Sequence, residues 1–277
     1  LGITSAEEQP VLPKGNNLSL HLLELFTSRV AKVGMTDGIR QVLQEESDAL
    51  RAYYEQAGIL IARPAGGTSC RLAISAKGGT NAENHNHNDV GSYAVALGSE
   101  TMVGDQGGPN SYPGDYFNGD APQKYKIKGS FGHPVPVVDG RTQSSGGKAK
   151  GVVLQKEFTN EKDVFSIDYT SAYSTPNLDK LIRTFVYDRQ GKGSFTVGDE
   201  FTAKTAITTR ADWKILDDTH LLLATDSEQM IVAIEASGKV AFTSETIEVN
   251  SPAYTRIGIA LKNQSKEGYI RLKMYTK

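Results

Sequence analysis

Two histidines lie close enough in the sequence to serve one site. His85 and His87 are two residues apart in the segment NAENHNHNDVGSY, and Asp89 follows with the same spacing. Alternate residues of extended backbone point to the same side, so both imidazoles can face one metal ion or one substrate. His-x-His is also a common tripeptide, and the alternative interpretation is a pair of surface-loop histidines with local hydrogen bonds.

Two residues farther along the chain extend this set. Asp105 closes the run TMVGD, and His133 stands in GSFGHPVPVVDG, before a proline-interrupted apolar run. Two neutral imidazoles and one carboxylate suit zinc, with a fourth position for water or another group. His87, Asp105 and His133 are therefore candidate metal ligands, although each taken singly also has an ordinary role in a turn or at the start of a strand.

The path of the chain decides whether these residues can meet. SYAVALG is typical of a strand, with a turn at residues 98–100 and a return strand in TMVGD. This hairpin puts Asp105 opposite about Tyr93, whereas His87 on a straight ladder would lie roughly 20 Å beyond it. A shared site thus requires HNHND to fold back over the sheet as a loop, which its asparagines and Gly91 permit.

The candidate residues lie in an irregular part of the chain. Between Gly78 and Gly147 there are 14 of the 28 glycines and three of the five histidines. Irregular segments of this length in a folded domain are usually functional or disordered. We therefore expect this region to carry the function.

Most of the chain predicts strands. The runs after residue 57 are short, rich in β-branched and aromatic residues and separated by Gly, Asp, Asn and Ser. In KLIRTFVYD, for example, Leu181, Phe185 and Tyr187 fall on one face. Because no helical pattern lies between these runs, parallel βαβ units are disfavoured and a large antiparallel β-sandwich is predicted.

The N-terminal part differs. From about Asn17 to Gln56 apolar residues recur at helical spacing. The predicted fold is therefore mainly β, a sandwich with a short helical N-terminal segment, divided into a helical linker (1–56) and a sandwich domain (57–277). The sequence starts LGITSAEEQP, without an initiator Met or a signal pattern, and we expect the chain to be cut from something longer.

Composition excludes several classes of protein. With 30 Lys and Arg against 32 Asp and Glu, the chain lacks the basic surface of a general nucleic-acid binder. Its single cysteine, Cys70, cannot form an intrachain disulfide. No segment approaches 18 uninterrupted apolar residues, so we predict no membrane span.

The motifs taken together are more specific than any one of them. HNHNDVGSY, MVGDQGG and SFGHPVPVVDG, in this order, resemble the C-terminal β-domain of the heparinase II/III-like polysaccharide lyases, a superfamily that also holds oligoalginate lyases. The resemblance extends over nearly everything from Tyr53 onward. It implies β-elimination from an acidic, uronic-acid-containing polysaccharide such as a glycosaminoglycan or alginate, and a bacterial protein of the periplasm or cell surface, or a secreted one.

The resemblance also implies roles for the residues. His85 would face the substrate and take part in catalysis, and His87, Asp105 and His133 would hold a mainly structural zinc ion. In such lyases an N-terminal α/α toroid supplies a catalytic tyrosine and an asparagine or histidine. About 55 residues precede the first predicted strand, too few for a toroid, so we expect the chain alone to have little or no lyase activity.

Other interpretations remain. The chain can be a metal-stabilised carbohydrate-binding module without chemistry, or a zinc hydrolase with Asp89 or Glu83 as the base. Alternating lysines on a predicted strand can hold a polyanion or protect a sheet edge; they are Lys124, Lys126 and Lys128. A calcium loop is a further, less favoured possibility, and its oxygen ligands would be Asp105, Asn110, Asp115, Asn118 and Asp120.

Overall fold

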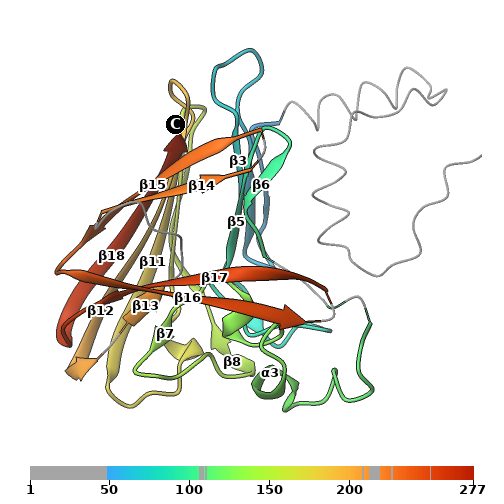
Figure 1. The fold of residues 1–277 in the computed structure, drawn as a ribbon, viewed down its shortest axis with the longest axis vertical. Coiled ribbons are helices and arrows are strands. Elements are labelled where there is room, and N and C mark those ends of the chain that lie inside the picture. The colour runs from blue at the N-terminus through green and yellow to red at the C-terminus, as the bar shows by residue number, and fades with distance from the viewer. Residues whose placement is uncertain are drawn as a thin grey trace, which may run out of the picture.

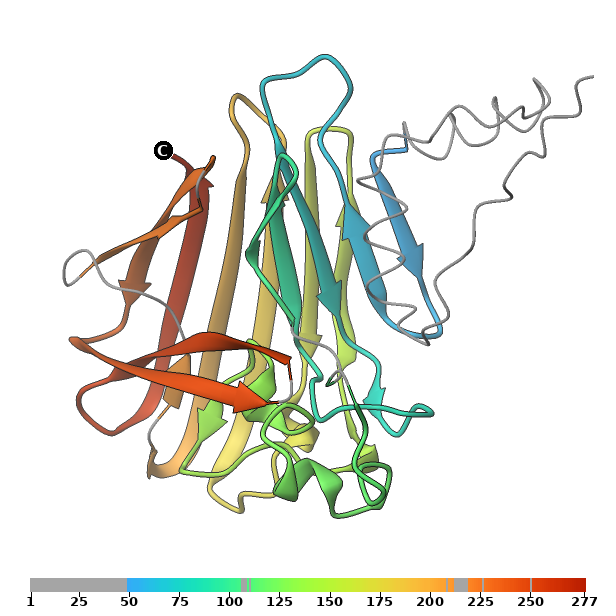
Figure 2. The ribbon, with the colours of Figure 1, turned by 45° about the vertical axis from the view of Figure 1, so that its right-hand side comes forward.

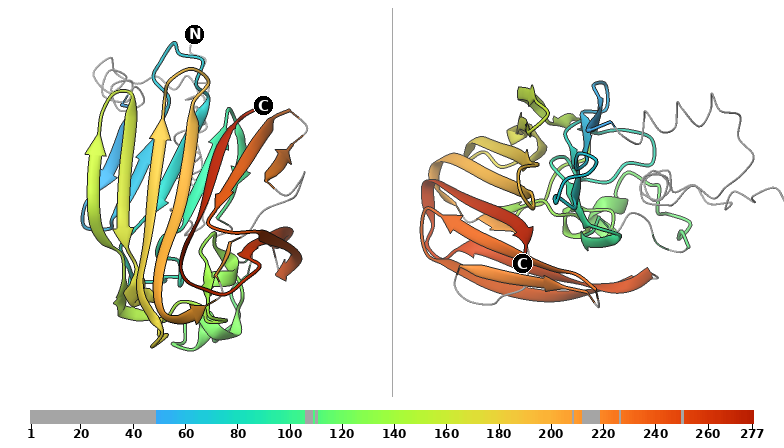
Figure 3. Two further views of the ribbon diagram at one scale, coloured as in Figure 1. Left: turned by 90° about the vertical axis from the view of Figure 1, so that its left-hand side faces the viewer. Right: turned by 90° about the horizontal axis from the view of Figure 1, so that it is seen from above.

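Two large antiparallel sheets face each other across a shared core (Figure 1). The computed structural model describes residues 49–105, 109, 111–207, 209–211, 219–225, 227–249 and 251–277. Figure 3, from above, shows the two sheets as separate layers. All strand pairs among the described residues are antiparallel, so the predicted antiparallel sandwich is confirmed.

The first sheet has five strands, in the order β1 (Arg51–Tyr54), β2 (Ile59–Ala62), β3 (Leu72–Lys77), β5 (Tyr93–Leu97) and β6 (Glu100–Val103). The second sheet has seven, in the order β14 (His220–Ala224), β15 (Gln229–Ala236), β18 (Ser265–Thr276), β12 (Ser194–Ile207), β11 (Leu178–Asp188), β10 (Lys162–Asp168) and β9 (Val152–Phe158).

Smaller elements lie at one end of the sandwich (Figure 2). A four-stranded sheet has the order β16 (Val240–Val249), β17 (Ser251–Leu261), β13 (Thr209–Ala211) and β7 (Val137–Val138), and a two-stranded one pairs β4 (Thr80–Asn81) with β8 (Gly146–Lys150). The helical turns are α3 (Ala121–Lys124), η1 (Ser130–Gly132) and η2 (Thr170–Ala172). No helix of the described part of the chain is long and apolar enough to cross a membrane.

Aromatic rings join the two sheets. Tyr93 of β5 makes edge contacts with Phe185 and Phe195 of the opposite sheet, at centroid distances of 6.1 and 5.8 Å. Phe165 stacks on Phe185 at 6.0 Å. Buried aromatic pairs of this kind contribute about 0.5–1.5 kcal/mol beyond the apolar area that they remove from water. The sandwich is therefore held by packing among its inward faces.

The predicted alternation in β11 is confirmed, because Leu181, Phe185 and Tyr187 are all buried. One residue on that face was not expected: Arg183 is also buried, among apolar side chains. The period of a strand predicts which residues face inward. It does not predict that one inward residue carries a charge.

The predicted helical pattern is wrong at its C-terminal end. Arg51–Tyr54 forms β1, paired with β2, so the sheet begins before residue 57. Tyr53 packs on the rings of Phe158 and Phe165, and this contact with the opposite sheet outweighs the local helical spacing. The rest of the expected helical segment, 17–48, lies outside the described residues.

Candidate functional site

The histidine segment leaves the sheet and returns to it at one point. Lys77, the last residue of β3, donates its backbone N–H to Ser92 O at 2.8 Å and accepts from Gly91 N at 2.9 Å. The residues between them, 78–91, form a loop closed at its base. HNHND therefore lies in a loop that returns to the start of β5, where Ser92 contacts Asp105.

A buried glutamine holds this loop from inside. Gln143 Nε2 donates to Val90 O at 2.7 Å, and its Oε1 accepts from Val90 N and from Asn81 Nδ2, both at 3.0 Å. Asn88 Nδ2 donates to the backbone oxygen of Gln143 at 2.9 Å. The amide thus pairs with both backbone groups of Val90 as a neighbouring strand would. Sequence reasoning missed Gln143, since it lies 53 positions from Val90 and stands in no motif.

Three predicted site residues meet. His133 Nδ1 lies 2.9 Å from both carboxylate oxygens of Asp105, and its Nε2 lies 3.0 Å from Nδ1 of His87. Ser92 Oγ donates to Asp105 Oδ2 at 2.5 Å. Residues from the loop, from the end of the β5–β6 hairpin and from the segment after η1 are therefore side by side.

The cluster can hold a metal ion, although its third member differs from the expected one. The ligand atoms that lie within 4.8 Å of one another belong to Asp89, Asp105 and His133. His87 faces the other ring nitrogen of His133, so one ion bound by His87, Asp105 and His133 requires His133 to change one of its partners. Imidazole and carboxylate donors in close contact fit zinc. Asp89 already accepts from Lys77 Nζ at 2.6 Å, which leaves it less available to a cation.

The charges of this cluster are strongly coupled. Burial alone would lower the pKa of His133, but the charge of Asp105 and the hydrogen bond to it raise that pKa. Burial alone would raise the pKa of Asp105, yet His133 and Ser92 hold it well below its usual range. Burial, with the nearby charge of His133, lowers the pKa of His87 to about 4. His87 is thus neutral near pH 7, the form that ligates metals.

His85 stands apart from the other three. Its side chain is exposed, and its ring packs edge-on against Phe117 at a centroid distance of 4.6 Å. Its φ of 59° lies in the left-handed region, which few residues other than glycine adopt and which recurs at functional sites. The loop therefore presents His85 outward while it keeps the half-buried His87 against the buried His133.

An aromatic cluster adjoins both histidines. Tyr116 packs against Tyr112, Phe117 and Tyr125 at centroid distances of 5.1 to 5.4 Å. The hydroxyl of Tyr116 lies 3.4 Å from Nε2 of His87. Sequence reasoning left these tyrosines out of the site, because nothing in their spacing separates them from tyrosines that pack in a core.

The predicted lysine face of a strand is wrong. Lys124 ends α3, and Lys126 and Lys128 lie in the turns that follow. Lys124 pairs with Asp115 and Lys126 with Glu245, both at the surface. Lys128 is instead 5 % exposed and donates to Tyr116 O at 2.7 Å. Pro122 and Gly129 favour turns here, which overrides the alternation.

Two of the proposed calcium ligands, Asp105 and Asp115, already bind other side chains of the protein. Asp115 accepts from Lys124 and Tyr125, and Asp105 belongs to the histidine cluster. Asn110 lies outside the described residues. A calcium loop remains a prediction.

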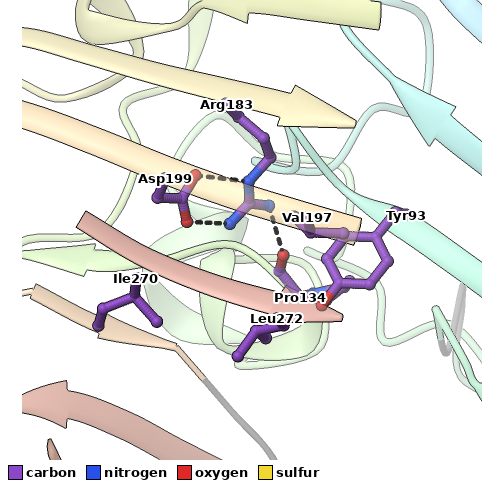
Figure 4. Close-up of a pocket in the computed structure, with 7 residues that line it drawn as sticks. All are labelled: Tyr93, Pro134, Arg183, Val197, Asp199, Ile270 and Leu272. Carbon is purple, nitrogen blue, oxygen red and sulfur yellow. Dashed lines mark hydrogen bonds and ion pairs between the residues drawn. The ribbon is translucent and has the colours of Figure 1, made fainter. Parts of the chain in front are cut away.

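An arginine supports the site from the core (Figure 4). Arg183 Nε and Nη2 donate to the two oxygens of Asp199 at 2.7 and 2.6 Å. Its Nη1 donates to Gly91 O and to Pro134 O, both at 2.7 Å. One guanidinium therefore joins the base of the histidine loop to the residue after His133. The strand pattern around Arg183 contained no signal for this role.

Comparison with known proteins identifies solved structures of the same fold. No protein-family model and no curated protein matches the sequence. Solved structures of polysaccharide lyases do share the fold, with sequence identities that are too low to show more than that. The matched structures include heparan sulfate lyase HepC and heparinase III.

The match extends over most of this chain. A mutant of heparan sulfate lyase HepC from Pedobacter heparinus has a TM-score of 0.66 at 14 % identity over 86 % of this chain, and Heparinase III has 0.62 at 18 % identity over 82 %. The chain corresponds to 39 % and 36 % of those two proteins. The resemblance to heparinase-like lyases therefore extends from the motifs to the fold, and the matched structures are much longer than this chain.

Proposed function

We propose that this chain is the β-domain of a lyase that cleaves a uronic-acid-containing polysaccharide by β-elimination. The observation that carries the proposal is the loop that presents His85 outward beside a cluster of His87, Asp105 and His133, on a fold shared with heparan sulfate lyase HepC. The remaining catalytic groups would come from an N-terminal helical domain, so the chain by itself has little or no activity.

The reaction needs a site that stabilises negative charge. A base removes the proton at C5 of the uronate, the C5–C4 double bond forms, the C4–O bond breaks and the leaving glycosidic oxygen takes a proton. The C5 proton is weakly acidic, so the developing charge on the carboxylate has to be neutralised. An exposed imidazole such as His85 can transfer a proton or donate a hydrogen bond to that carboxylate.

The cluster of His87, Asp105 and His133 would stabilise the loop. His87, Asp105 and His133 are the residues that would hold zinc, which supplies a structural cross-link when bound. Gln143 and Arg183 fix the same loop through Val90 and Gly91. In this proposal they set the position of His85 and touch no substrate.

A lyase is distinguished from a hydrolase and from a binding module by its product. The protein joined to its upstream helical domain should release an unsaturated uronate, detected by ultraviolet absorbance, from heparan sulfate or another uronate polysaccharide. His85→Ala should lower turnover at least a hundredfold while polysaccharide binding stays within about threefold. His220→Ala, on the distant β14, is the matched control.

Three results would contradict the proposal. Saturated products would indicate hydrolysis. Unchanged turnover in His85→Ala would remove His85 from catalysis. Binding without turnover in the longer protein would favour a metal-stabilised carbohydrate-binding module, for which the exposed rings of Tyr112 and Phe117 beside His85 already offer a surface.

We also propose a location in the bacterial periplasm, at the cell surface or outside the cell. The support is the size of the substrate, because a polysaccharide is met outside the cytoplasm. Fractionation of the native host, with the protein detected by antibody, tests it.

A further inference from the structure

We propose that Lys128 is the anion-binding group of a sugar subsite beside His85, which receives the acidic group of one monosaccharide unit while the exposed rings of Tyr112 and Phe117 receive its C–H face. This proposal rests on the proposed function for the identity of the ligand. It rests on the structure for the place and chemistry of the subsite.

The ammonium of Lys128 is buried with few partners. The residue is 5 % exposed, and its Nζ donates to Tyr116 O at 2.7 Å. It also lies 4.9 and 5.1 Å from the ring centroids of Tyr116 and Phe117. An ammonium has three N–H donors, and within the described residues no further oxygen accepts from Nζ and no carboxylate forms an ion pair with it.

Such a cation is costly without a counter-ion. A buried charge is normally paired or fully hydrogen-bonded, because loss of water disfavours the charged form. Consistent with this, burial lowers the pKa of Lys128. Its two neighbours in the lysine series contrast with it, since Lys124 and Lys126 are exposed and each pairs with a carboxylate. Among the described residues the charge of Lys128 therefore has no carboxylate partner, and an anionic ligand would compensate it.

The surroundings indicate what kind of anion fits. Phe117 is 49 % exposed and Tyr112 46 % exposed, and their rings lie 5.2 Å apart. Phe117 also contacts His85, so the apolar rings, the cation and the exposed imidazole form one cluster. A sugar ring has an apolar C–H face that packs on aromatic rings, and a uronate or a sulfated sugar carries the negative charge as well. An inorganic anion alone would make no contact with the exposed rings of Tyr112 and Phe117, whereas a sugar can pack on them.

The test compares three variants with three ligands on the 277-residue chain. Lys128→Met removes the charge and keeps the apolar stem, Lys128→Arg keeps the charge, and Lys126→Met is the matched control at an exposed lysine. The ligands are a heparin-derived tetrasaccharide, its desulfated form, and a desulfated form with its carboxyl groups reduced. Dissociation constants come from calorimetry or from NMR titration that follows the ring protons of His85.

We expect Lys128→Met to weaken binding of the acidic ligands at least tenfold and to leave binding of the neutral ligand unchanged. Lys128→Arg should restore binding to within about threefold, and Lys126→Met should match the wild type. Loss of affinity for both acidic forms identifies the carboxylate as the bound group, and loss for the sulfated form alone identifies the sulfate.

Stability separates a ligand site from a structural cation. Because Met removes a buried charge that pairs with no carboxylate of the described residues, Lys128→Met should keep or raise the melting temperature. Wild-type binding of the acidic ligands by Lys128→Met, a lowered melting temperature with unchanged affinity, or no binding by the wild-type chain would each overturn the proposal. If the longer protein turns over substrate but Lys128→Met binds the acidic ligands as the wild type does, the subsite is rejected and the lyase proposal is kept. If the longer protein shows no turnover but Lys128→Met loses affinity for the acidic ligands, the subsite is kept and the lyase proposal is rejected.

Discussion

His133 Nδ1 lies 2.9 Å from both carboxylate oxygens of Asp105. The same ring turns its other nitrogen to His87, at 3.0 Å. His133 is therefore in contact with both other members of the cluster. A metal ion that binds His133 must replace the hydrogen bond that one of its ring nitrogens makes with Asp105 or His87. The consequence is a competition between protons and metal for one buried imidazole.

Zinc binding tests this arrangement. We expect one zinc ion per chain, lost in Asp105→Asn and in His133→Ala, as measured by elemental analysis after dialysis. His87→Gln should lower the zinc affinity at least tenfold in a chelator competition, because it removes a neutral nitrogen ligand. Asp89→Asn should stay within about threefold, since Asp89 is paired with Lys77. A larger loss in Asp89→Asn than in His87→Gln would replace His87 with Asp89 in the ligand set.

The pH dependence of the metal-free protein reports on His87. Its pKa is lowered to about 4 in the folded protein, whereas an unfolded histidine titrates near 6.5. The unfolded chain thus binds more protons between these values, and the contribution of His87 is fully present above about pH 6.5 and lost as pH falls toward 4. We expect the free energy of unfolding, measured by denaturant titration in EDTA, to fall less steeply with decreasing pH in His87→Gln than in wild type. The two slopes should differ by the equivalent of up to about one bound proton.

The matched control for this pH series is His220→Gln. An unchanged pH slope in His87→Gln would show that His87 is not buried as a neutral ring.

Gly132 fixes the approach of His133 to the site. A Cβ at this position would lie 2.4 Å from the backbone oxygen of Ile127, so Gly132→Ala forces the segment before His133 to move. We expect a loss of about 1–3 kcal/mol in the free energy of unfolding and a lower zinc affinity. Gly119→Ala, where a Cβ meets nothing within 4 Å, is the control. Equal behaviour of the two variants in thermal unfolding and zinc titration would contradict this role.

Arg183 and Asp199 form a buried pair with two separable effects. Asp199→Asn leaves the guanidinium without its counter-charge and should cost about 3–5 kcal/mol in denaturant unfolding. The double variant Arg183→Met/Asp199→Leu should regain part of that stability, because two apolar side chains replace the pair. Its zinc affinity should fall below that of the wild type, since Gly91 O and Pro134 O have lost their donor. Wild-type zinc affinity in the double variant would mean that Arg183 acts only on stability.

Local patterns predicted the parts of the fold that depend on neighbours in sequence. The hairpin of β5 and β6 and the inward face of β11 follow from alternation and turn residues alone. Arg51–Tyr54 was misread, because its strand is selected by contacts of Tyr53 with rings more than 100 residues away. Helical spacing over two turns is too weak a signal to resist such packing.

The candidate site was predictable in its motif residues and not in its supports. His87, Asp105 and His133 are found by residue type and order, and the structure brings them together. Gln143 and Arg183 reach the same loop across 53 and 92 positions. Their types are ordinary for a turn and for a strand, so only the three-dimensional arrangement reveals them. The roles of the motif residues stay predictions until metal and product are measured.

The outer strand of the larger sheet has a consequence for handling the protein. β9 is the last strand of its sheet, and Val152, Val153 and Leu154 are exposed there. An open edge with consecutive apolar side chains is a template on which further strands add. Lys156 and Glu157 follow after Gln155 and are exposed, and charges in such positions act as gatekeepers against aggregation. We therefore expect these two charged side chains to limit aggregation through this edge, while Lys156 also pairs with Glu55 of the opposite side of the sandwich.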